Sequence, residues 1–279
     1  MSAIKGQEGD PAILYETAPA KLNLALHVRG RRSDGRHDLE TIFAFCLAGD
    51  RLSAGPGEGL SMTIDGPFAE GLSTGEDNLV IRAAQALAKA ARVPVNASLH
   101  LSKALPVASG IGGGSADAGA ALRLLTRLWR IDPTHASAIA PALGSDVPAC
   151  LLSMTARGAG AGDALTLDDD ARIGGAPVLL VNPGVPLSTG PVFASWDGVD
   201  KGSLGDWREG RNDLEPAARA LVPAIGDVLN WLGTQRGTTL ARMSGSGATC
   251  FALFADEDAR DAAAADCPPD WWHLATALR

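Results

Sequence analysis

The sequence has no excess of positive charge. Its 24 Lys and Arg residues are outnumbered by 32 Asp and Glu residues, so the formal net charge is −8. Proteins that bind nucleic acid or an anionic membrane surface usually carry a basic patch, and a net acidic chain offers no such footprint. We therefore expect neither nucleic acid nor a membrane among the partners of this protein.

Long apolar runs and closely spaced cysteines are also absent. The chain has no uninterrupted apolar run of about 18 residues, the length that suggests a membrane-spanning helix. Residues 1–10 carry acids and glycine instead of the basic start and apolar stretch of a signal peptide. Cys46, Cys150, Cys250 and Cys267 are scattered without metal-ligand spacing. These features predict a soluble, cytoplasmic protein with reduced thiols.

The length and composition are those of an ordinary globular protein. With 279 residues, 46% of them hydrophobic and 20% charged, the chain can form a sizeable core and two domains. Residues 1–11 are predicted to be a disordered tail. The glycine-rich run 158–162, followed by three consecutive aspartates at 168–170, marks the expected division into domains 12–160 and 161–279.

Two common nucleotide-binding signatures are missing. The pattern G-x-x-x-x-G-K-[ST] does not occur, and Ser115 stands where a dinucleotide fingerprint would need its third glycine. Instead, four glycines fall in the five positions 110–114 and lead into a segment with apolar residues at helical spacing. Ser115 is placed as an N-cap and Asp117 in the first turn.

Such a loop can bring backbone N–H groups against an anion, and the helix N-terminus beyond it adds oriented donors. The segment is therefore predicted to cradle phosphate. The alternative is a flexible linker or a tight strand-to-helix connection, because glycine often simply marks turns.

Polar side chains interrupt the first predicted strand, which runs from about Ile13 to Val28. Leu22, Leu24, Leu26 and Val28 alternate with polar or small residues there, so Lys21, Asn23 and His27 are predicted to share one face. That face either meets water, as one side of an antiparallel sheet often does, or lines a cleft in which Lys21 meets substrate.

Three further side chains have both a functional and a structural interpretation. Asp146 leads into an apolar segment and is either a buried carboxylate or a helix cap. Lys103 precedes the glycine loop and lies either near phosphates or in solvent. His37, in the polar loop 30–38 with its Asp34-Gly35 turn, is either a ligand contact or solvated.

The second half of the chain contains strands and helices in succession. Strands are predicted at 177–181, 240–243 and 249–254, with the small-residue loop 244–247 between the last two and a helix over 256–266. A strand, a glycine loop, a strand and a helix in this order indicate an α+β unit with an antiparallel sheet.

Three segments together resemble one family, the GHMP kinases. Ala18–Leu24, Pro106–Ala118 and Met243–Thr249 are similar to the three motifs of that family and stand in the family order. The resemblance covers most of residues 12–270. It implies an α+β, two-domain fold in which a ribosomal protein S5 domain 2-like N-terminal domain binds ATP and a ferredoxin-like C-terminal domain completes the site.

Three more segments narrow the resemblance to one branch of the family. Gly30–His37, Ser145–Pro148 and Asn212–Pro216 resemble the branch that phosphorylates the 2-hydroxyl of 4-(cytidine 5'-diphospho)-2-C-methyl-D-erythritol in non-mevalonate isoprenoid biosynthesis. The implied cofactors are ATP and Mg²⁺, and the implied assembly is a monomer or a homodimer. The alternatives are another GHMP kinase, of the homoserine or mevalonate type, and a non-catalytic nucleotide-binding relative.

The resemblance also implies residue roles. Asp146 matches the catalytic base, and Lys21 matches the lysine that orients it and stabilises developing charge. Asn23, His37 and Phe193 match substrate-binding positions. Arg36 stands where the family usually has a tyrosine that stacks on cytosine, and a guanidinium plane can stack in its place. Ser115 is a candidate Mg²⁺ contact. The residues implied to bind ATP are Pro106, Val107, Ala108, Ser109, Gly110, Ile111, Gly112, Gly113, Gly114, Ser115 and Ala116.

Overall fold

The computed structural model describes residues 13–167 and 173–279. Within these ranges the chain forms ten strands and eight helices, and strands and helices are mixed along the sequence. The expected tail at 1–11 and the aspartates at 168–170 lie outside the described residues. The mixture of helices and two separate sheets is the predicted α+β fold.

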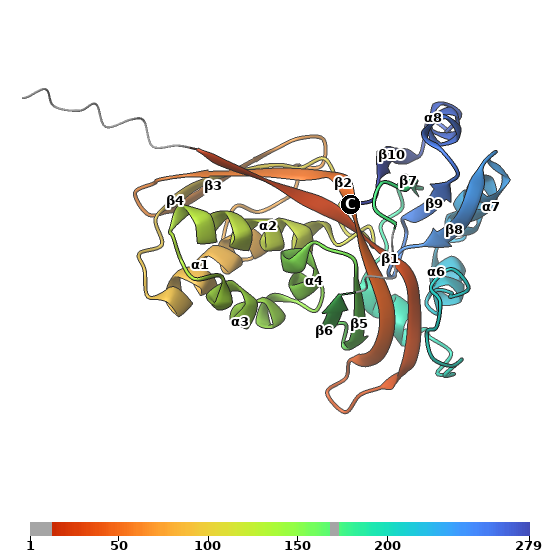
Figure 1. Cartoon of the computed structure of the whole chain (residues 1–279), viewed down its shortest axis with the longest axis horizontal. Helices are drawn as coiled ribbons and strands as arrows, with labels where there is room; N and C mark the ends of the chain where they lie inside the picture. The colour runs from red at the N-terminus through yellow and green to blue at the C-terminus, as the bar shows by residue number, and fades with distance from the viewer. Residues whose placement is uncertain (1–12, 168–172) are drawn as a thin grey trace, which may run out of the picture.

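A long hairpin organises the larger sheet. Strands β1 (Leu14–Arg31) and β2 (His37–Gly55) pair antiparallel along most of their length. Gly35 adopts a φ of +83° in the connecting turn, which confirms the turn predicted at Asp34-Gly35. Figure 1 shows the hairpin running past the helices of residues 79–152 and on past the helices of the second half of the chain. The remaining strands of this sheet are β3 (Leu60–Asp65), β4 (Ala97–Ser102), β5 (Ala156–Gly160) and β6 (Ala164–Leu167), in the order β3-β4-β2-β5-β6.

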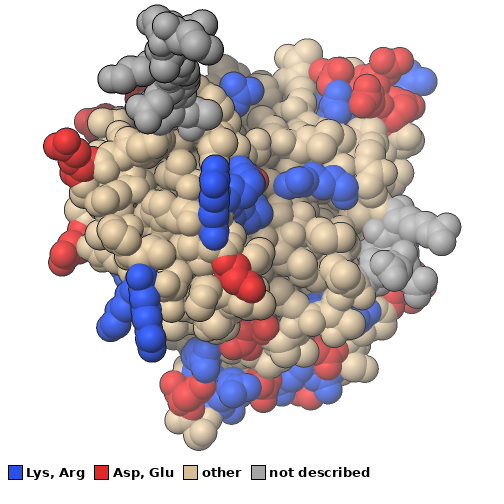
Figure 2. All heavy atoms as spheres, turned by 60° about the vertical axis from the view of Figure 1, so that its left-hand side comes forward, with Lys and Arg blue, Asp and Glu red and all other residues tan. Residues whose placement is uncertain are grey.

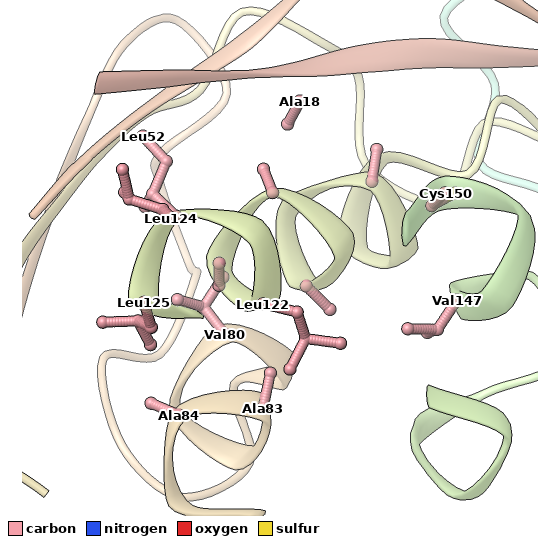
Figure 3. Packing of buried hydrophobic residues seen from close by; sticks show 14 of the residues in the cluster. Ala18, Leu52, Val80, Ala83, Ala84, Leu122, Leu124, Leu125, Val147 and Cys150 are labelled. Carbon is pink, nitrogen blue, oxygen red and sulfur yellow. The ribbon is translucent and has the colours of Figure 1, made fainter. Parts of the chain in front are cut away.

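Four helices pack beside the larger sheet (Figure 1). They are α1 (Leu79–Ala91), α2 (Gly113–Leu128), α3 (Pro133–Leu143) and α4 (Val147–Leu152). Helix α2 lies at the centre of the group, and Figure 3 shows Leu122, Leu124 and Leu125 from α2 among the side chains of its neighbours. Each fully buried leucine contributes about 1.5–3 kcal/mol through the hydrophobic effect. Burial of α2 therefore holds the segment that follows the glycine loop.

The smaller sheet has the strand order β10-β7-β9-β8, and all its pairs are antiparallel. Its strands are β7 (Pro177–Asn182), β8 (Thr238–Met243), β9 (Cys250–Phe254) and β10 (Trp272–Ala277). The associated helices are α5 (Thr189–Ala194), α6 (Glu215–Leu221), α7 (Ala224–Thr234) and α8 (Glu257–Ala265). The antiparallel arrangement of β8 and β9 around the loop 244–247 confirms the predicted α+β unit.

The two sheets share apolar contacts. Leu22 and Leu24 of β1 are fully buried in one cluster with Val178 and Leu180 of β7 and Phe251 of β9. One strand of the long hairpin thus supplies apolar side chains to the interface between the sheets. The site described below lies on β1 close to this shared core.

Some local expectations differ from the structure. Helix α2 begins at Gly113 with Gly112 as N-cap, so Ser115 lies inside the first turn and is not the cap. The segment Thr189–Ala194, for which no helix was predicted, forms the short helix α5. The expected domain division between residues 160 and 161 stays a prediction; the next strand, β6, pairs with β5 in the larger sheet.

The distribution of surface charge and the state of the cysteines agree with what the composition suggests. On the face shown in Figure 2, charged side chains of both signs are scattered among uncharged residues. All four cysteines are free thiols, and three of them are buried, as predicted. Among the helices of residues 13–167 and 173–279, none combines the length and apolarity that crossing a bilayer requires.

Candidate active site

Segments from both halves of the chain enclose a cavity of about 420 Å³. Strand β1, the glycine loop and the start of α4 form one part of its wall, and α5 and the β8–β9 loop form another. Its lining includes the sequence-predicted residues Lys21, Asn23, Ala108, Ser109, Gly110, Gly112, Gly113, Gly114, Ser115, Asp146 and Phe193. The three family-like motifs, which lie far apart in the sequence, therefore converge on one site.

Lys21 and Asp146 form an ion pair in this cavity. The Nζ atom of Lys21 lies 2.9 Å from Oδ2 of Asp146. The Lys21 side chain is 4% exposed, whereas the Asp146 side chain is 33% exposed. Asp146 stands at the N-cap of α4, but its carboxylate makes no capping hydrogen bond to the helix. The carboxylate is thus open to the cavity on one side and held by an ammonium on the other, so it is neither a helix cap nor a fully buried acid.

Asn23 fixes the position of the lysine. Its Oδ1 accepts a hydrogen bond from Lys21 Nζ at 2.8 Å, and its Nδ2 donates to Thr41 Oγ1 at 2.8 Å. The Thr41 hydroxyl donates in turn to the backbone carbonyl of Ala25. This chain of hydrogen bonds gives each partner a defined donor or acceptor role. The amide of Asn23 is therefore engaged with protein groups, although the residue lines the cavity.

His27 does not join Lys21 and Asn23 in the cavity, so the expectation that all three share one face was wrong. The register of the β1–β2 pair shifts between Asn23 and Ala25, where β1 contains an extra residue. A β-bulge of this kind breaks the alternation of side chains along the strand. The His27 ring instead contacts the backbone of Gly202 and Arg211, and its burial lowers its pKa.

The glycine loop is held tightly against the β8–β9 loop. Gly110 has a φ of +77°, and a Cβ atom there would lie 2.6 Å from the carbonyl oxygens of Ser244 and Gly247. Gly112 has a φ of +66°, and a Cβ atom there would lie 2.9 Å from Cε of Lys21. Ser244 Oγ donates to the Gly110 carbonyl at 3.1 Å. Glycine is required at both positions by close approach and by backbone conformation.

A second cavity of about 270 Å³ adjoins the first and shares Leu79, Ala108, Gly113 and Gly114 with it. Lys103 lies in its wall, and of the two alternatives given for it the solvated one is wrong. The ammonium is buried and lies 2.5 Å from Asp50 Oδ2 and 2.7 Å from Asp117 Oδ2. The sequence carries no local signal for this cluster, because its members come from three separate segments.

A third cavity of about 380 Å³ also adjoins the first and shares Leu39, Ser145, Ala161 and Phe193 with it. His37 and Phe193 lie in its wall with their ring centroids 4.8 Å apart. Burial, followed by the charge of Arg31, lowers the pKa of His37. Within the described part of the chain, the buried Nε2 of His37 has no hydrogen-bond partner.

Arg36 also lines the third cavity, but it is exposed to solvent. Its side chain is 53% exposed, and its Nε and Nη2 donate to Oδ2 of Asp34 at 3.0 and 2.9 Å. The guanidinium plane is therefore oriented by a carboxylate at the rim of the cavity.

Sequence reasoning missed several residues that brace the site. Asn212 Nδ2 donates to the carbonyls of Met243 and Gly245, both at 2.8 Å, and so holds the β8–β9 loop. Asp213 Oδ2 accepts a hydrogen bond from the backbone of Val28 on β1. The Asn212–Pro216 segment was recognisable as a motif, but these bracing contacts join residues far apart in the chain and could not be read from the sequence.

The described residues contain no group of three His, Cys, Asp or Glu side chains placed to hold a metal ion. Magnesium in nucleotide sites usually has only one or two protein ligands, together with phosphate oxygens and water. The partly exposed Asp146 carboxylate and the Ser115 hydroxyl, which both line the central cavity, fit that limited role.

Known proteins resemble the chain over almost its full length. The family description "GHMP kinases N terminal domain" matches residues 78–154, and "GHMP kinases C terminal" matches residues 197–272. A protein of Rhizorhabdus wittichii named 4-diphosphocytidyl-2-C-methyl-D-erythritol kinase is 54% identical, over 95% of this chain and 94% of the relative. A protein of Sphingopyxis alaskensis with the same name is 51% identical, over 96% and 99%.

A solved structure supports the same relationship. The crystal structure of a 4-(cytidine 5'-diphospho)-2C-methyl-D-erythritol kinase superposes with a TM-score of 0.80 at 30% identity, over 95% of this chain and 99% of that one. With two matching domain families and relatives of this identity and coverage, the chain belongs to the 4-diphosphocytidyl-2-C-methyl-D-erythritol kinase family of the GHMP kinases.

Proposed function

We propose that the protein transfers the γ-phosphoryl group of ATP to the 2-hydroxyl of 4-(cytidine 5'-diphospho)-2-C-methyl-D-erythritol. The observation that carries this proposal is the Lys21–Asp146 pair in the central cavity, which shares wall residues with one cavity beside the glycine loop and with another beside His37 and Phe193. Two substrates that extend from these two cavities into the central one would meet at this pair. The names of the relatives agree with this reaction.

Asp146 is proposed as the general base. Its carboxylate accepts the proton of the substrate hydroxyl while the hydroxyl oxygen forms a bond to the γ-phosphorus of ATP. The bond between that phosphorus and the β,γ-bridging oxygen breaks, and the electron pair leaves with ADP. Because the carboxylate is open to the cavity on one side, a substrate hydroxyl can approach it without displacing Lys21.

Lys21 is proposed to orient this base and to stabilise charge. Asp146 and Asn23 together use two of its three N–H donors, so the third can point toward the reacting oxygens. A fixed ammonium in a partly enclosed site stabilises the developing alkoxide and the spreading phosphoryl charge. The buried chain through Asn23 and Thr41 holds the ammonium in place.

The segment Pro106–Ala116 is proposed to bind the triphosphate. Helix α2 has 16 residues and begins at Gly113, and its N-cap Gly112 has no side chain to cap it, so the first N–H groups of the helix remain available to an anion. Mg²⁺ bound with ATP would neutralise phosphate charge, and Ser115 and Asp146 are the side chains that would lie nearest to it.

The third cavity is proposed to hold the cytidine part of the substrate. His37 and Phe193, whose ring centroids lie 4.8 Å apart in its wall, offer ring surface to a base. Arg36 is proposed to cover the base with its guanidinium plane, in a direction set by Asp34. Asn23 is proposed to act mainly through Lys21. The free thiols fit a cytoplasmic location.

The test is ATP turnover measured by coupled release of ADP. The wild-type protein should release ADP from ATP in the presence of the cytidine-diphosphate substrate but not in the presence of homoserine or mevalonate. Asp146→Asn, which keeps the size and removes the base, should lower kcat by about 10²–10⁴-fold. Asp227→Asn, an exposed carboxylate on α7, is the matched control and should leave kcat unchanged.

Three results would contradict the proposal or a part of it. Turnover with homoserine or mevalonate in preference to the cytidine compound would assign the protein to another substrate class. ATP binding without turnover of any of the three alcohols would indicate a nucleotide-binding protein without kinase activity. Equal kcat values for the wild type and Asp146→Asn would remove Asp146 as the base.

A further inference from the structure

Four arginines lie at the end of the long hairpin, and the charge of one of them is not balanced by a carboxylate. Three of them form ion pairs at 3.1, 2.8 and 2.9 Å: Arg29, Arg32 and Arg36, with Asp200, Asp38 and Asp34 in the same order. The fourth, Arg31, pairs with no carboxylate in residues 13–167 and 173–279. Its positive charge is therefore available to a ligand.

Arg31 lies in the wall of the third cavity. It is the last residue of β1 and stands directly opposite His37 in the pairing with β2, and both residues line this cavity. Its Nη2 donates a long hydrogen bond of 3.4 Å to the carbonyl of Ala194, at the end of α5. A guanidinium has five N–H donors, so most of those of Arg31 are free of partners within the described residues.

The third cavity has a positive electrostatic character. Its described lining includes Arg31 and Arg36 but no carboxylate, and the guanidinium of Arg36 is paired with Asp34. The charge of Arg31 also lowers the pKa of His37, after the larger effect of burial, so its field reaches the opposite strand. In a chain with a net charge of −8, a cavity with an unbalanced cation favours an anionic ligand.

The proposed substrate brings such an anion into this region. Its diphosphate joins the cytidine to the erythritol unit, and each of the two phosphates carries a negative charge. A molecule with its base in the third cavity and its hydroxyl at Asp146 must place the diphosphate along the path between the two cavities. The other cations on this path are already engaged, Lys21 with Asp146 and Arg36 with Asp34.

We propose that Arg31 binds the diphosphate of the cytidine substrate and thereby selects cytidine compounds that carry phosphate. The planar guanidinium can donate two parallel hydrogen bonds to phosphate oxygens, which gives direction as well as charge neutralisation. Arg31 takes no part in bond making or breaking and acts as a specificity-determining residue. This inference rests on the proposed function, because it requires the cytidine group in the third cavity.

The test is the affinity of the protein for three probes that differ only in phosphate: cytidine, cytidine monophosphate (CMP) and cytidine diphosphate (CDP). Isothermal titration calorimetry would measure each one with the ATP site filled by a non-hydrolysable ATP analogue. Arg31→Gln removes the charge and should weaken CDP binding by about five- to twentyfold, since a charged hydrogen bond in a partly open cavity is lost. The loss should be smaller for CMP and less than about twofold for cytidine.

Two further variants make the test specific. Arg31→Lys keeps the charge but loses the planar fork, so its CDP affinity should lie between those of the wild type and Arg31→Gln. Arg236→Gln removes one exposed positive charge between α7 and β8, away from the lining of the three cavities, and should bind all three probes as the wild type does. A merely structural role for Arg31, such as holding α5 through Ala194, would weaken all three probes by the same factor.

A second measurement compares ionic strengths. Raising the salt concentration from about 50 to about 200 mM should weaken binding of CDP to the wild type and leave binding of cytidine unchanged, because salt screens charges exposed to solvent. The effect of salt on CDP binding should be smaller for Arg31→Gln.

Three outcomes would overturn the inference. The first is equal weakening of cytidine and CDP by Arg31→Gln, and the second is an equal effect of salt on CDP binding in the wild type and Arg31→Gln. Turnover of the cytidine substrate together with an unchanged CDP affinity of Arg31→Gln is the third, and it leaves the proposed function intact. Failure of the wild type to bind CDP or to turn over the cytidine substrate would overturn the proposed function as well.

Discussion

Two glycine-to-alanine substitutions in the same loop are predicted to have opposite effects on stability. Gly110 has a left-handed φ of +77°, and a Cβ atom there would lie 2.6 Å from two backbone carbonyl oxygens, of Ser244 and Gly247. Gly114 lies in the first turn of α2, and a Cβ atom there would meet nothing within 4 Å. Comparing the two substitutions therefore distinguishes an effect of tight packing between the loops from a general effect of replacing a glycine in this segment.

The magnitude follows from two costs. The left-handed conformation costs an alanine about 1–2 kcal/mol, and overpacking against backbone that cannot move adds about 1–3 kcal/mol, so Gly110→Ala should lower the free energy of unfolding by about 2–5 kcal/mol. Gly114→Ala replaces a poor helix former by the best one and should raise the free energy of unfolding by up to about 1 kcal/mol.

The assay is urea unfolding followed by circular dichroism, without ligand, for the wild type and both variants. If the free energy of unfolding of Gly110→Ala lies within about 1 kcal/mol of the wild-type value, the close contact between the glycine loop and the β8–β9 loop is refuted. Equal destabilisation by both substitutions would show that any side chain in this segment is disfavoured, which would refute the distinction drawn from the geometry.

Two further predictions concern the third cavity. Burial and the charge of Arg31 lower the pKa of His37, so the folded state favours the neutral ring. Its stabilising effect should be complete above the unfolded-state pKa of about 6.5 and decrease as the pH falls below it. Urea unfolding at successive pH values should show that His37→Gln loses less stability than the wild type as the pH falls. An unchanged dependence of stability on pH would contradict the lowered pKa of His37. Phe193→Ala should raise KM for the cytidine substrate by about ten- to a hundredfold, whereas Arg36→Ala, whose guanidinium is exposed and held by Asp34, should raise it less than tenfold. Steady-state kinetics at saturating ATP would test both, and a larger effect of Arg36→Ala would reverse the ranking.

Local sequence patterns predicted much of the secondary structure correctly. The strands predicted from about Ile13 to Val28 and at 177–181 form as β1 and β7. The Asp34-Gly35 turn and the helix after the glycine loop also form where they were expected. These features depend on residues within one or two turns of each other, so a single segment contains the necessary information.

The sequence by itself determined which chemical groups the site could contain. The glycines at 110 and 112–114, the lysine within an apolar strand and the aspartate before α4 are local features; the glycines predict a phosphate-binding loop, and the kinase activity is implied by the resemblance of these segments to the GHMP kinase motifs. Their order along the chain is enough to indicate the family.

Only the tertiary structure decided how those groups are used. The alternation in β1 predicted His27 beside Lys21, but a bulge in the pairing with β2 separates them. Lys103 gave no sign of burial, because its partners Asp50 and Asp117 reach it from other segments. The sequence allowed Asp146 to be a helix cap or a buried carboxylate, and the structure places its carboxylate 2.9 Å from Lys21 Nζ without a capping hydrogen bond. Burial, charge pairing and strand register depend on which distant segments meet, and short-range patterns carry no information about that.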